Sequence, residues 1–388
     1  MTELQPDRTD AILGGQNPQP VNAAVLGGVA GAKQRLQHEK ALTRKHKFWR
    51  NFEYLNRRIN REATNYQHAA IFANKQVINF EPDLDIVAPK ENAYAIRVFP
   101  GIGAISYEDK LLSLIEKPNS NQIEALVFGT AHYGKWIKPF DFLMTFYDDL
   151  PNLEAIFLGD FNQEDMRVAL LAGFSEGNLS QILSKYSQLQ LLQIRYGSGY
   201  IFTEYRHEKL KALRIEISYG AYECLTGINK LDLPSLEYLE LWIDAPASKN
   251  NLLMNELNQL FWRSKFPKLK YLGIKNCQFA DDVAIGIAKA PLMERLIELD
   301  LSLGNVSSKG LSALLSSNFI NELDVLNVSA SSTFTNEFWE MNVSSISSEF
   351  ITNTIPEFDL RCKVIVGGEQ GSMDIAYVEN QMRVSTED

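Results

Sequence analysis

The chain has 388 residues, a formal net charge of −10 and a hydrophobic share of 45%, values that are ordinary for a globular protein. No run of residues is long and apolar enough for a membrane-spanning helix, and the N-terminus lacks the basic-then-apolar pattern of a secretion signal. Three widely separated cysteines, Cys224, Cys277 and Cys362, favour buried thiols in a reducing compartment over a disulfide framework or a zinc site. We therefore expect a cytoplasmic protein without a transmembrane segment.

Charge is distributed unevenly along the chain. Residues 33–75 hold eleven Lys or Arg against three Asp or Glu, a net charge of +8. Residues 1–32 carry −2, which leaves −16 for the chain from Gln76 onward. A basic segment therefore precedes an acidic body, and it either folds against that body or engages an anionic partner.

Residues 1–32 form a Gly/Pro-rich leader in which AILGG at 11–15 recurs as AVLGG at 24–28. Glycine pairs and prolines prevent a continuous helix, so we expect a flexible or docking tail. The stretch from Asp10 to Leu36 resembles an N-terminal stretch of uncharacterised cyanobacterial proteins that carry repeat domains. That resemblance implies a shared lineage and a shared attachment role.

Residues 33–80 are expected to form a basic amphipathic segment, with helix over 33–65. Its apolar residues recur at helical spacing and make one stripe: Phe48, Phe52, Leu55 and Ile59. The cations on the other faces are Lys45, Lys47, Arg50, Arg57, Arg58 and Arg61. Such a helix fits three roles: a cap over an open end of the core, a nucleic-acid contact, or a contact with an anionic membrane surface. We favour the cap, because a stack of repeats must cover its ends.

A regular pattern follows further along the chain. We expect a strand at Tyr94–Val98, a helix around Leu111–Lys117 and a strand at Ile123–Phe128. Seven segments of the form L-x-x-L-x-L then complete a series of eight. Their anchors are Leu153/Ile156/Leu158, Leu189/Leu192/Ile194, Leu210/Leu213/Ile215, Leu236/Leu239/Leu241, Leu269/Leu272/Ile274, Leu296/Leu299/Leu301 and Leu323/Leu326/Val328. The last four start 33, 27 and 27 residues apart, close to the leucine-rich-repeat period of about 20–29.

Segments with helical spacing lie between these strands, for example Leu253, Leu257 and Leu260. Asp281 is expected to cap the helix that follows Phe279. Alternation of strand and helix predicts an α/β leucine-rich-repeat solenoid, with a curved parallel sheet inside, helices outside and a helical N-terminal cap. We assign 81–360 to the solenoid and 361–388 to a C-terminal strand or tail.

The repeat region also resembles a known family. From Leu126 to Leu315 the chain is similar to an uncharacterised bacterial leucine-rich-repeat family, with matching segments that include LPNLEAIFLGDF, LPSLEYLELWI and FPKLKYLGIKNCQFADD. The resemblance spans about residues 123–328. It implies the solenoid fold and no catalytic or binding residues.

Chemistry-bearing patterns are missing from the sequence. The five histidines have no metal-binding spacing, no cysteine pair supports zinc, and no nucleophile elbow occurs. Cys277 with His207 is the one nucleophile pair that can be imagined, and nothing in the spacing supports it. We therefore predict no enzyme activity, no catalytic residue, no metal and no cofactor.

One face of the predicted sheet remains as the candidate site. In each repeat, positions 3, 5 and 7 point away from the leucine core, so neighbouring strands should align them in three columns. The residues we expect to bind a protein there are Arg195, Arg214, Glu216, Tyr238, Glu240, Trp242, Tyr271 and Lys275. Tyr, Trp and Arg are enriched at energetic hot spots. Alternatively, these aromatic residues pack under a loop or under the N-terminal helix.

The sequence thus predicts a non-catalytic protein-protein interaction module that binds a protein partner on the concave sheet. The alternative is a protein that associates with nucleic acid or an anionic surface through the basic residues from Lys45 to Arg61.

Overall fold

The computed structural model describes residues 68–98, 105–129, 138–161, 177–195, 200–217, 220–243, 249–262 and 266–328, and the strand backbones at 333–335, 338–340, 363–367 and 375–378. The leader at 1–32 and the basic helix expected at 33–65 lie outside the described residues.

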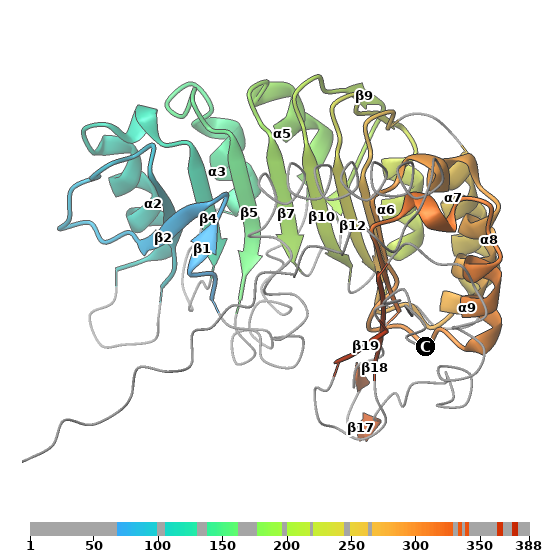
Figure 1. Cartoon of the computed structure of the whole chain (residues 1–388). Coiled ribbons are helices and arrows are strands. Elements are labelled where there is room, and N and C mark those ends of the chain that lie inside the picture. Colours follow the sequence, from blue (N-terminus) through green and yellow to red (C-terminus); the bar gives the residue numbers. More distant parts are fainter. Residues whose placement is uncertain are drawn as a thin grey trace, which may run out of the picture.

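The fold is mixed α/β and is built on one large, mostly parallel sheet (Figure 1). Its strands, in spatial order, are β1 (Ile71–Phe72), β2 (Lys75–Asn79), β3 (Asn92–Ile96), β4 (Ala125–Gly129), β5 (Ala155–Asp160), β7 (Leu191–Arg195), β10 (Ala212–Ile217), β12 (Tyr238–Ile243), β13 (Tyr271–Lys275), β14 (Glu298–Asp300), β15 (Val325–Asn327), β18 (Lys363–Gly367) and β19 (Ile375–Val378). Among the described strands of this sheet, β1–β2 and β18–β19 pair antiparallel and the others pair parallel. The sheet is open, because β1 and β19 end it at opposite sides.

Three short strand pairs lie outside this sheet: β6 (Gly177–Asn178) with β8 (Tyr200–Ile201), β9 (Tyr205–Arg206) with β11 (Leu231–Asp232), and β16 (Thr333–Thr335) with β17 (Phe338–Glu340). The last pair lies in the serine-rich region after Ser329.

Helices follow the strands of the main sheet. Within the described residues they are α2 (Tyr107–Glu116), α3 (Pro139–Thr145), α5 (Leu179–Lys185), α6 (Ala221–Ile228), α7 (Asn250–Trp262), α8 (Ala280–Ala288) and α9 (Ser308–Leu315), with short 3-10 helices at Ser120–Gln122, Pro291–Arg295 and Ile320–Glu322. Figure 1 shows the sheet turning from face-on at β4 to edge-on near β18, with α7, α8 and α9 on its outer side. The sheet therefore curves away from its helices.

The main core lies between this sheet and the helices. Anchors of the repeats face it: Leu239 and Leu241 of β12 are fully buried in the same cluster as Leu253 and Leu257 of α7. Burying one such leucine contributes about 1.5–3 kcal/mol. All eight strands expected between Ile123 and Val328 are present, because their leucines alternate with the pleat of a strand.

The expected columns are also confirmed by strand register. Ala212 pairs with Leu191 on one side and Tyr238 on the other, and Tyr238 pairs with Tyr271. The next two columns follow in the same register: Gln193, Arg214, Glu240 and Gly273, then Arg195, Glu216, Trp242 and Lys275.

The sheet extends beyond residues 81–360 at both ends. The sheet begins at Ile71, inside the segment 33–80 that the sequence assigned to a helical cap, because the turn at Ala73 and Asn74 reverses the chain with left-handed backbone angles. At the other end, β18 pairs parallel with β15. Residues 361–388 thus contribute two strands to the same sheet.

Asp281 does not cap its own helix. Phe279 precedes α8 and makes no side-chain cap, whereas Asp281 Oδ1 accepts hydrogen bonds from the backbone N–H groups of Ser307 (2.7 Å) and Gly310 (3.1 Å). The carboxylate therefore links α8 to the start of α9. Within the described part of the chain, no helix has the length and apolar character needed to cross a membrane.

Candidate functional site

The sheet face turned away from the helices, which we call the inner face, has its own buried apolar cluster. The buried members are Phe72, Ala93, Ala95, Ala125, Val127, Ala155, Phe157, Leu191, Ala212, Tyr238, Tyr271 and Ile297. None of these residues belongs to a helix. The inner face is therefore a second packed surface, separate from the leucine core.

All eight residues predicted to bind a protein lie on this face, on four adjacent strands. Arg195 is on β7, Arg214 and Glu216 are on β10, Tyr238, Glu240 and Trp242 are on β12, and Tyr271 and Lys275 are on β13. Seven of them are buried, with Tyr238, Glu240, Tyr271 and Lys275 at 0% exposure; Arg195 is partly buried. The alternation of side chains along each strand predicted on which face these residues lie. Their burial depends on tertiary packing.

Charges of alternating sign run across these strands in a series that we call the polar row: Arg195, Glu216, Arg214, Glu240, Lys275 and Asp300. Arg195 Nε lies 3.0 Å from Glu216 Oε2. Arg214 continues the row with an Nη2–Glu216 Oε1 distance of 2.7 Å and an Nε–Glu240 Oε1 distance of 3.0 Å. Buried charges are costly unless they are paired, and here each cation faces a carboxylate.

Glu240 is the centre of the polar row. Its carboxylate accepts hydrogen bonds from Trp242 Nε1 (2.6 Å) and from the Tyr238 hydroxyl. Burial raises the pKa of the Glu240 carboxyl, but the charges of Arg214 and Lys275 together with these hydrogen bonds outweigh it and lower the pKa overall. Glu240 is therefore ionised in the folded protein.

Tyr271 connects Glu240 to the next carboxylate. Its hydroxyl lies 3.1 Å from oxygens of both Glu240 and Asp300. Its ring stacks on that of Tyr238, with centroids 4.1 Å apart. Burial raises the pKa of both tyrosines, so their hydroxyls stay protonated and can donate.

Asp300, on β14, was missed by sequence reasoning. Lys275 Nζ lies 3.3 Å from Asp300 Oδ2, and both side chains are fully buried. Asp300 occupies position 5 of its repeat, as Glu240 does, so applying the position rule one repeat further would have found it.

A second cluster centres on Asp160, at the end of β5. Its Oδ2 accepts a hydrogen bond from Arg97 Nε (2.8 Å), and its Oδ1 accepts one from the backbone N–H of Ala69 (2.8 Å). Burial raises the pKa of Asp160, but the hydrogen bond from His68 and the charges of Arg97 and Arg195 lower it overall. Gly129 gives the arginine room, because a Cβ there would lie 2.9 Å from Arg97 Cγ.

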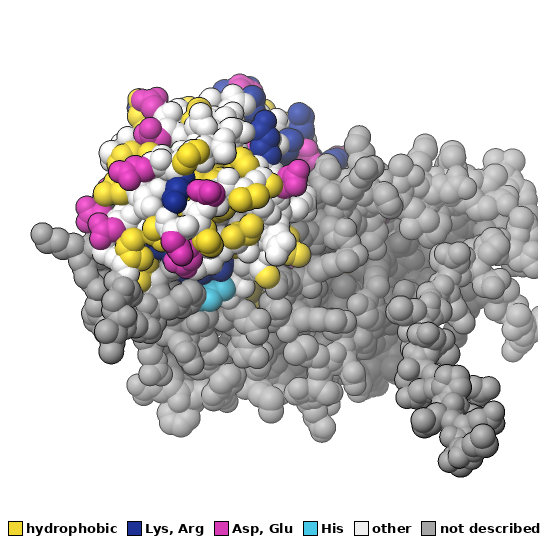
Figure 2. All heavy atoms as spheres, turned by 90° about the vertical axis from the view of Figure 1, so that its left-hand side faces the viewer, with side chains coloured by type: hydrophobic (Ala, Val, Ile, Leu, Met, Phe, Trp, Pro, Cys, Tyr) yellow, Lys and Arg dark blue, Asp and Glu magenta, His cyan; other side chains and the backbone are white. Residues whose placement is uncertain are grey.

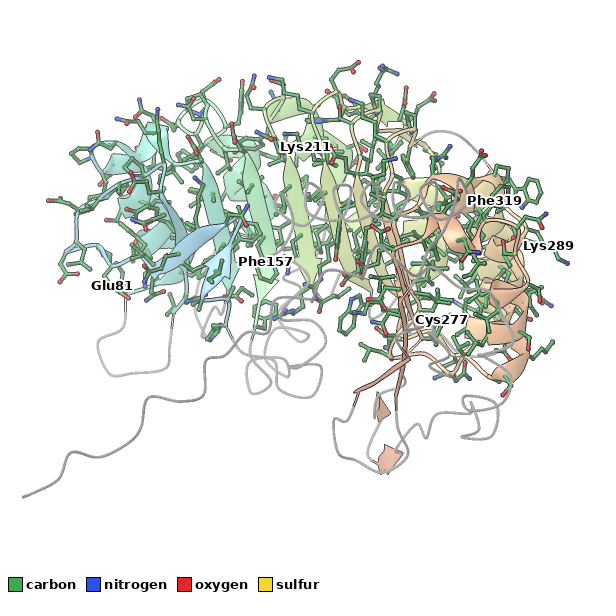
Figure 3. All side chains as sticks on the ribbon, viewed as in Figure 1. Glu81, Phe157, Lys211, Cys277, Lys289 and Phe319 are labelled. Atoms are coloured by element: carbon green, nitrogen blue, oxygen red, sulfur yellow. The ribbon has the colours of Figure 1, made fainter. Side chains whose placement is uncertain are left out.

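Small side chains make room for β1 on the same face. Phe72 packs against Phe157 with ring centroids 5.7 Å apart, in the cluster that contains Ala93, Ala125 and Ala155. Figure 3, where Phe157 is labelled, shows this side chain beside β1. Phe72 of β1 thus packs on the inner face against β5, whereas β2 pairs with β3 within the sheet.

Cys277 and His207 are not arranged as a catalytic nucleophile and its base. Burial raises the pKa of Cys277 to about 12, so its thiol is protonated at neutral pH. His207 Nε2 lies 3.1 Å from the carbonyl oxygen of Tyr186, and Nδ1 accepts the backbone N–H of Leu210 at 3.0 Å. Both ring nitrogens are therefore engaged by backbone groups. Among the described residues, no group of three or more His, Cys, Asp or Glu could hold a metal ion.

No protein-family model and no curated protein matches the chain. Among solved structures, it is similar to the crystal structure of a protein from Bacteroides fragilis, a Northeast Structural Genomics Consortium target. The TM-score is 0.56 and the sequence identity 21%, over 70% of this chain and 72% of that chain. A likeness at this identity concerns the fold alone.

Proposed function

We propose that the chain is a leucine-rich-repeat solenoid of the bacterial family that residues 123–328 resemble, and that it acts as a non-catalytic protein-binding module. The strand order supports the solenoid, because each central strand pairs with the strands of the preceding and following segments. The solenoid is also supported by the anchor residues, because the same positions of successive segments are buried in one core.

The observation that carries the binding function is the composition of the inner face. Tyr238, Tyr271 and Trp242 lie on its adjacent strands β12 and β13, and among the described residues no helix residue belongs to the apolar cluster on that face. Aromatic rings and arginines on such a surface are the types that contribute most to protein interfaces. We propose that the inner face takes a polypeptide segment.

The polar row prepares this face for binding. Its side chains are already held by ion pairs and hydrogen bonds, so a segment that binds there orders few of them and loses little conformational entropy. The arginines at one end of the row, Arg195 and Arg214, keep 11% and 10% of their side-chain area exposed. They are the groups that can give a bound segment polar contacts.

Affinity capture from a native extract tests this function. We expect Trp242→Ala to lose a protein that the wild type captures, because the indole lies on the inner face and donates a hydrogen bond to Glu240 of the polar row. Trp262→Ala is the matched control, since Trp262 is 57% exposed on α7. Circular dichroism should show that both variants are folded. Capture of the same proteins by wild type and both variants would contradict binding at the inner face.

The net +8 charge of residues 33–75 favours one alternative, contact with nucleic acid or an anionic membrane surface. Phosphate contacts make binding fall steeply with salt. Replacing Arg57, Arg58 and Arg61 with alanine should then abolish binding to duplex DNA or anionic vesicles, measured by fluorescence anisotropy and by co-sedimentation. The matched control replaces three exposed lysines of the body: Lys209, Lys211 and Lys289.

A further inference from the structure

We infer that His207 is an acid-sensitive switch: its neutral ring holds the turn that leads into β10, and protonation of the ring opens that turn. β10 carries Arg214 and Glu216 of the polar row. The inference goes beyond the proposed function, because it concerns how pH controls the order of this strand. It stands whatever the inner face binds.

The hydrogen bonds of the ring fix its protonation state. Nδ1 of His207 faces two backbone N–H groups, those of Lys209 at 3.3 Å and of Leu210 at 3.0 Å. Because both groups are donors, Nδ1 must be an acceptor and carries no hydrogen. Nε2 then carries the single ring proton and donates it to the carbonyl oxygen of Tyr186, at 3.1 Å. These contacts therefore require one neutral tautomer.

His207 connects its own turn to α5 and to β11. The ring contacts Tyr186, which ends α5, and the backbone N–H of His207 donates to the carbonyl oxygen of Asp232 in β11 at 3.0 Å. Leu210, whose N–H the ring accepts, is a repeat anchor that is fully buried in the main core. The histidine is itself only 3% exposed. Loss of the ring's contacts therefore acts on the start of β10 and on its neighbours.

Protonation of the ring reverses one of these contacts. A second proton turns Nδ1 into a donor that points at the N–H groups of Lys209 and Leu210, so two backbone donors lose their acceptor inside the protein. The positive ring must also give up most of its hydration where it is buried. The charged form is therefore accommodated only when the turn opens.

The direction of the pH effect follows from the same surroundings. Burial lowers the pKa of His207; the Tyr186 carbonyl and the charge of Glu208 raise it, the charge of Lys209 lowers it, and the pKa stays below its ordinary value. The opened state thus binds more protons in acid. Stabilisation of the turn is complete above the unfolded-state pKa of about 6.5 and is lost as the pH falls through the folded-state pKa.

The other titratable side chains of the elements around the ring have contacts of their own. They are Lys185 and Tyr186 at the end of α5, Tyr205 and Arg206 of β9, and Asp232 of β11. Lys185 Nζ lies 3.9 Å from the centroid of the Tyr147 ring, and the Tyr186 hydroxyl donates to the carbonyl oxygen of Leu143. Arg206 and Asp232 form an exposed ion pair. The Tyr205 ring centroid lies 6.5 Å from that of His207. Both nitrogens of His207 contact backbone groups, so none of these side chains holds the charged form.

Hydrogen exchange of the full chain, followed by mass spectrometry at pH 7.5 and pH 5.5, tests the inference. After correction for the intrinsic pH dependence of exchange, opening of residues 207–217 should increase several-fold at pH 5.5. The upper limit is about tenfold at one pH unit below the unfolded-state pKa of about 6.5. Peptides from α8 and α9 should show no such increase.

His207→Asn is the decisive variant. An asparagine side-chain oxygen accepts the N–H groups two and three residues further on, as Nδ1 does here, and it does not titrate. This variant should stay folded and lose the pH response.

His68→Asn is the matched control and should keep the wild-type response. Figure 2, which looks onto the N-terminal end of the sheet, shows a histidine side chain at the molecular surface. His68 lies at that end and keeps 18% of its side-chain area exposed, so its protonation does not require an opened turn.

Nitrogen NMR of the imidazole rings in the wild type gives a readout that depends on no variant, and it decides the question even where His207→Asn does not fold. His207 should show the Nε2–H tautomer and titrate below about pH 6.5. The other tautomer, titration at or above that pH, or a His207→Asn protein that keeps the pH response would each overturn the inference. None of these results touches binding at the inner face, because the capture experiment is carried out at one pH.

Discussion

At the scale of single residues, Glu240 is the most constrained group described. Its carboxylate is fully buried, faces Arg214, and accepts hydrogen bonds from side chains on its own strand and on β13. Gly273 makes this possible, since a Cβ there would lie 2.9 Å from the Tyr271 hydroxyl and 3.1 Å from Glu240 Cγ. The hydrogen bonds around Glu240 therefore depend on the absence of a side chain at Gly273.

We expect Glu240→Ala to lower the free energy of unfolding by about 3–5 kcal/mol, because it leaves the buried Arg214 with one carboxylate fewer and removes the acceptor of Trp242. Urea denaturation would measure this. Glu208→Ala is the control, since its ion pair with Arg206 is largely exposed and should matter little. Equal effects of both changes would contradict the importance of the buried network.

The pKa values of Glu240 and Asp160 predict a loss of stability in acid. Both are lowered in the folded protein, so the unfolded chain binds protons at a higher pH than the folded one. Their stabilisation is complete above the unfolded-state values of about 4 and is lost as the pH falls through the folded-state values. Urea midpoints measured from pH 7 to pH 3 should fall below about pH 4, and less steeply in Glu240→Gln.

At the scale of elements, α8 and α9 are coupled by one carboxylate. Asp281 lies in the first turn of α8, and it accepts hydrogen bonds from backbone groups at the start of α9. Gly310 allows the close approach, because a Cβ there would lie 2.3 Å from Asp281 Oδ1. The start of α9 is thus stabilised partly by a side chain of α8.

Asp281→Ala should lower the free energy of unfolding by about 1–2 kcal/mol, as loss of a helix cap does. Asp282→Ala, at the exposed neighbouring position, should have little effect. Gly310→Ala should destabilise the protein although alanine favours helix, and it should cost less when combined with Asp281→Ala. Thermal unfolding of the four variants would measure these terms. A stabilising Gly310→Ala would contradict the described geometry.

At the scale of the whole molecule, contacts are mainly between neighbours in the chain. The central strands pair in sequence order from β2 to β15, and only β18 joins across a longer connection. In the solenoid that we propose, stability is contributed by each unit and by the interfaces with its neighbours. Damage in one repeat should therefore stay local.

Leu272→Ala, at a fully buried position of β13, tests this locality. It should destabilise its region by about 2–5 kcal/mol. Hydrogen exchange followed by mass spectrometry should show faster exchange in β12, β13 and β14 and little change in β3, β4 and β5. A uniform increase along the chain would indicate that the whole sheet unfolds as one unit.

Much of the fold could be predicted because its signal is local. The spacing of Leu239 and Leu241 fixes a strand and its buried face, and repetition fixes the parallel register that brings Arg214 beside Glu240. The same rule aligned Tyr238 with Tyr271. These inferences need only the pleat of a strand and the stacking of like units.

Tertiary structure decided what the pattern leaves open. Position within a repeat gives the direction of a side chain and no information about its burial, so the pairing of Lys275 with Asp300 at 0% exposure was not predictable. The β1–β2 hairpin was assigned to a helical segment, because two-residue and five-residue strands carry too little periodicity. Asp281 contacts a helix start about 26 residues away, a distance that capping rules based on neighbouring residues do not cover. The sequence by itself therefore determined the repeating unit, and the tertiary structure decided how the polar side chains of different units meet.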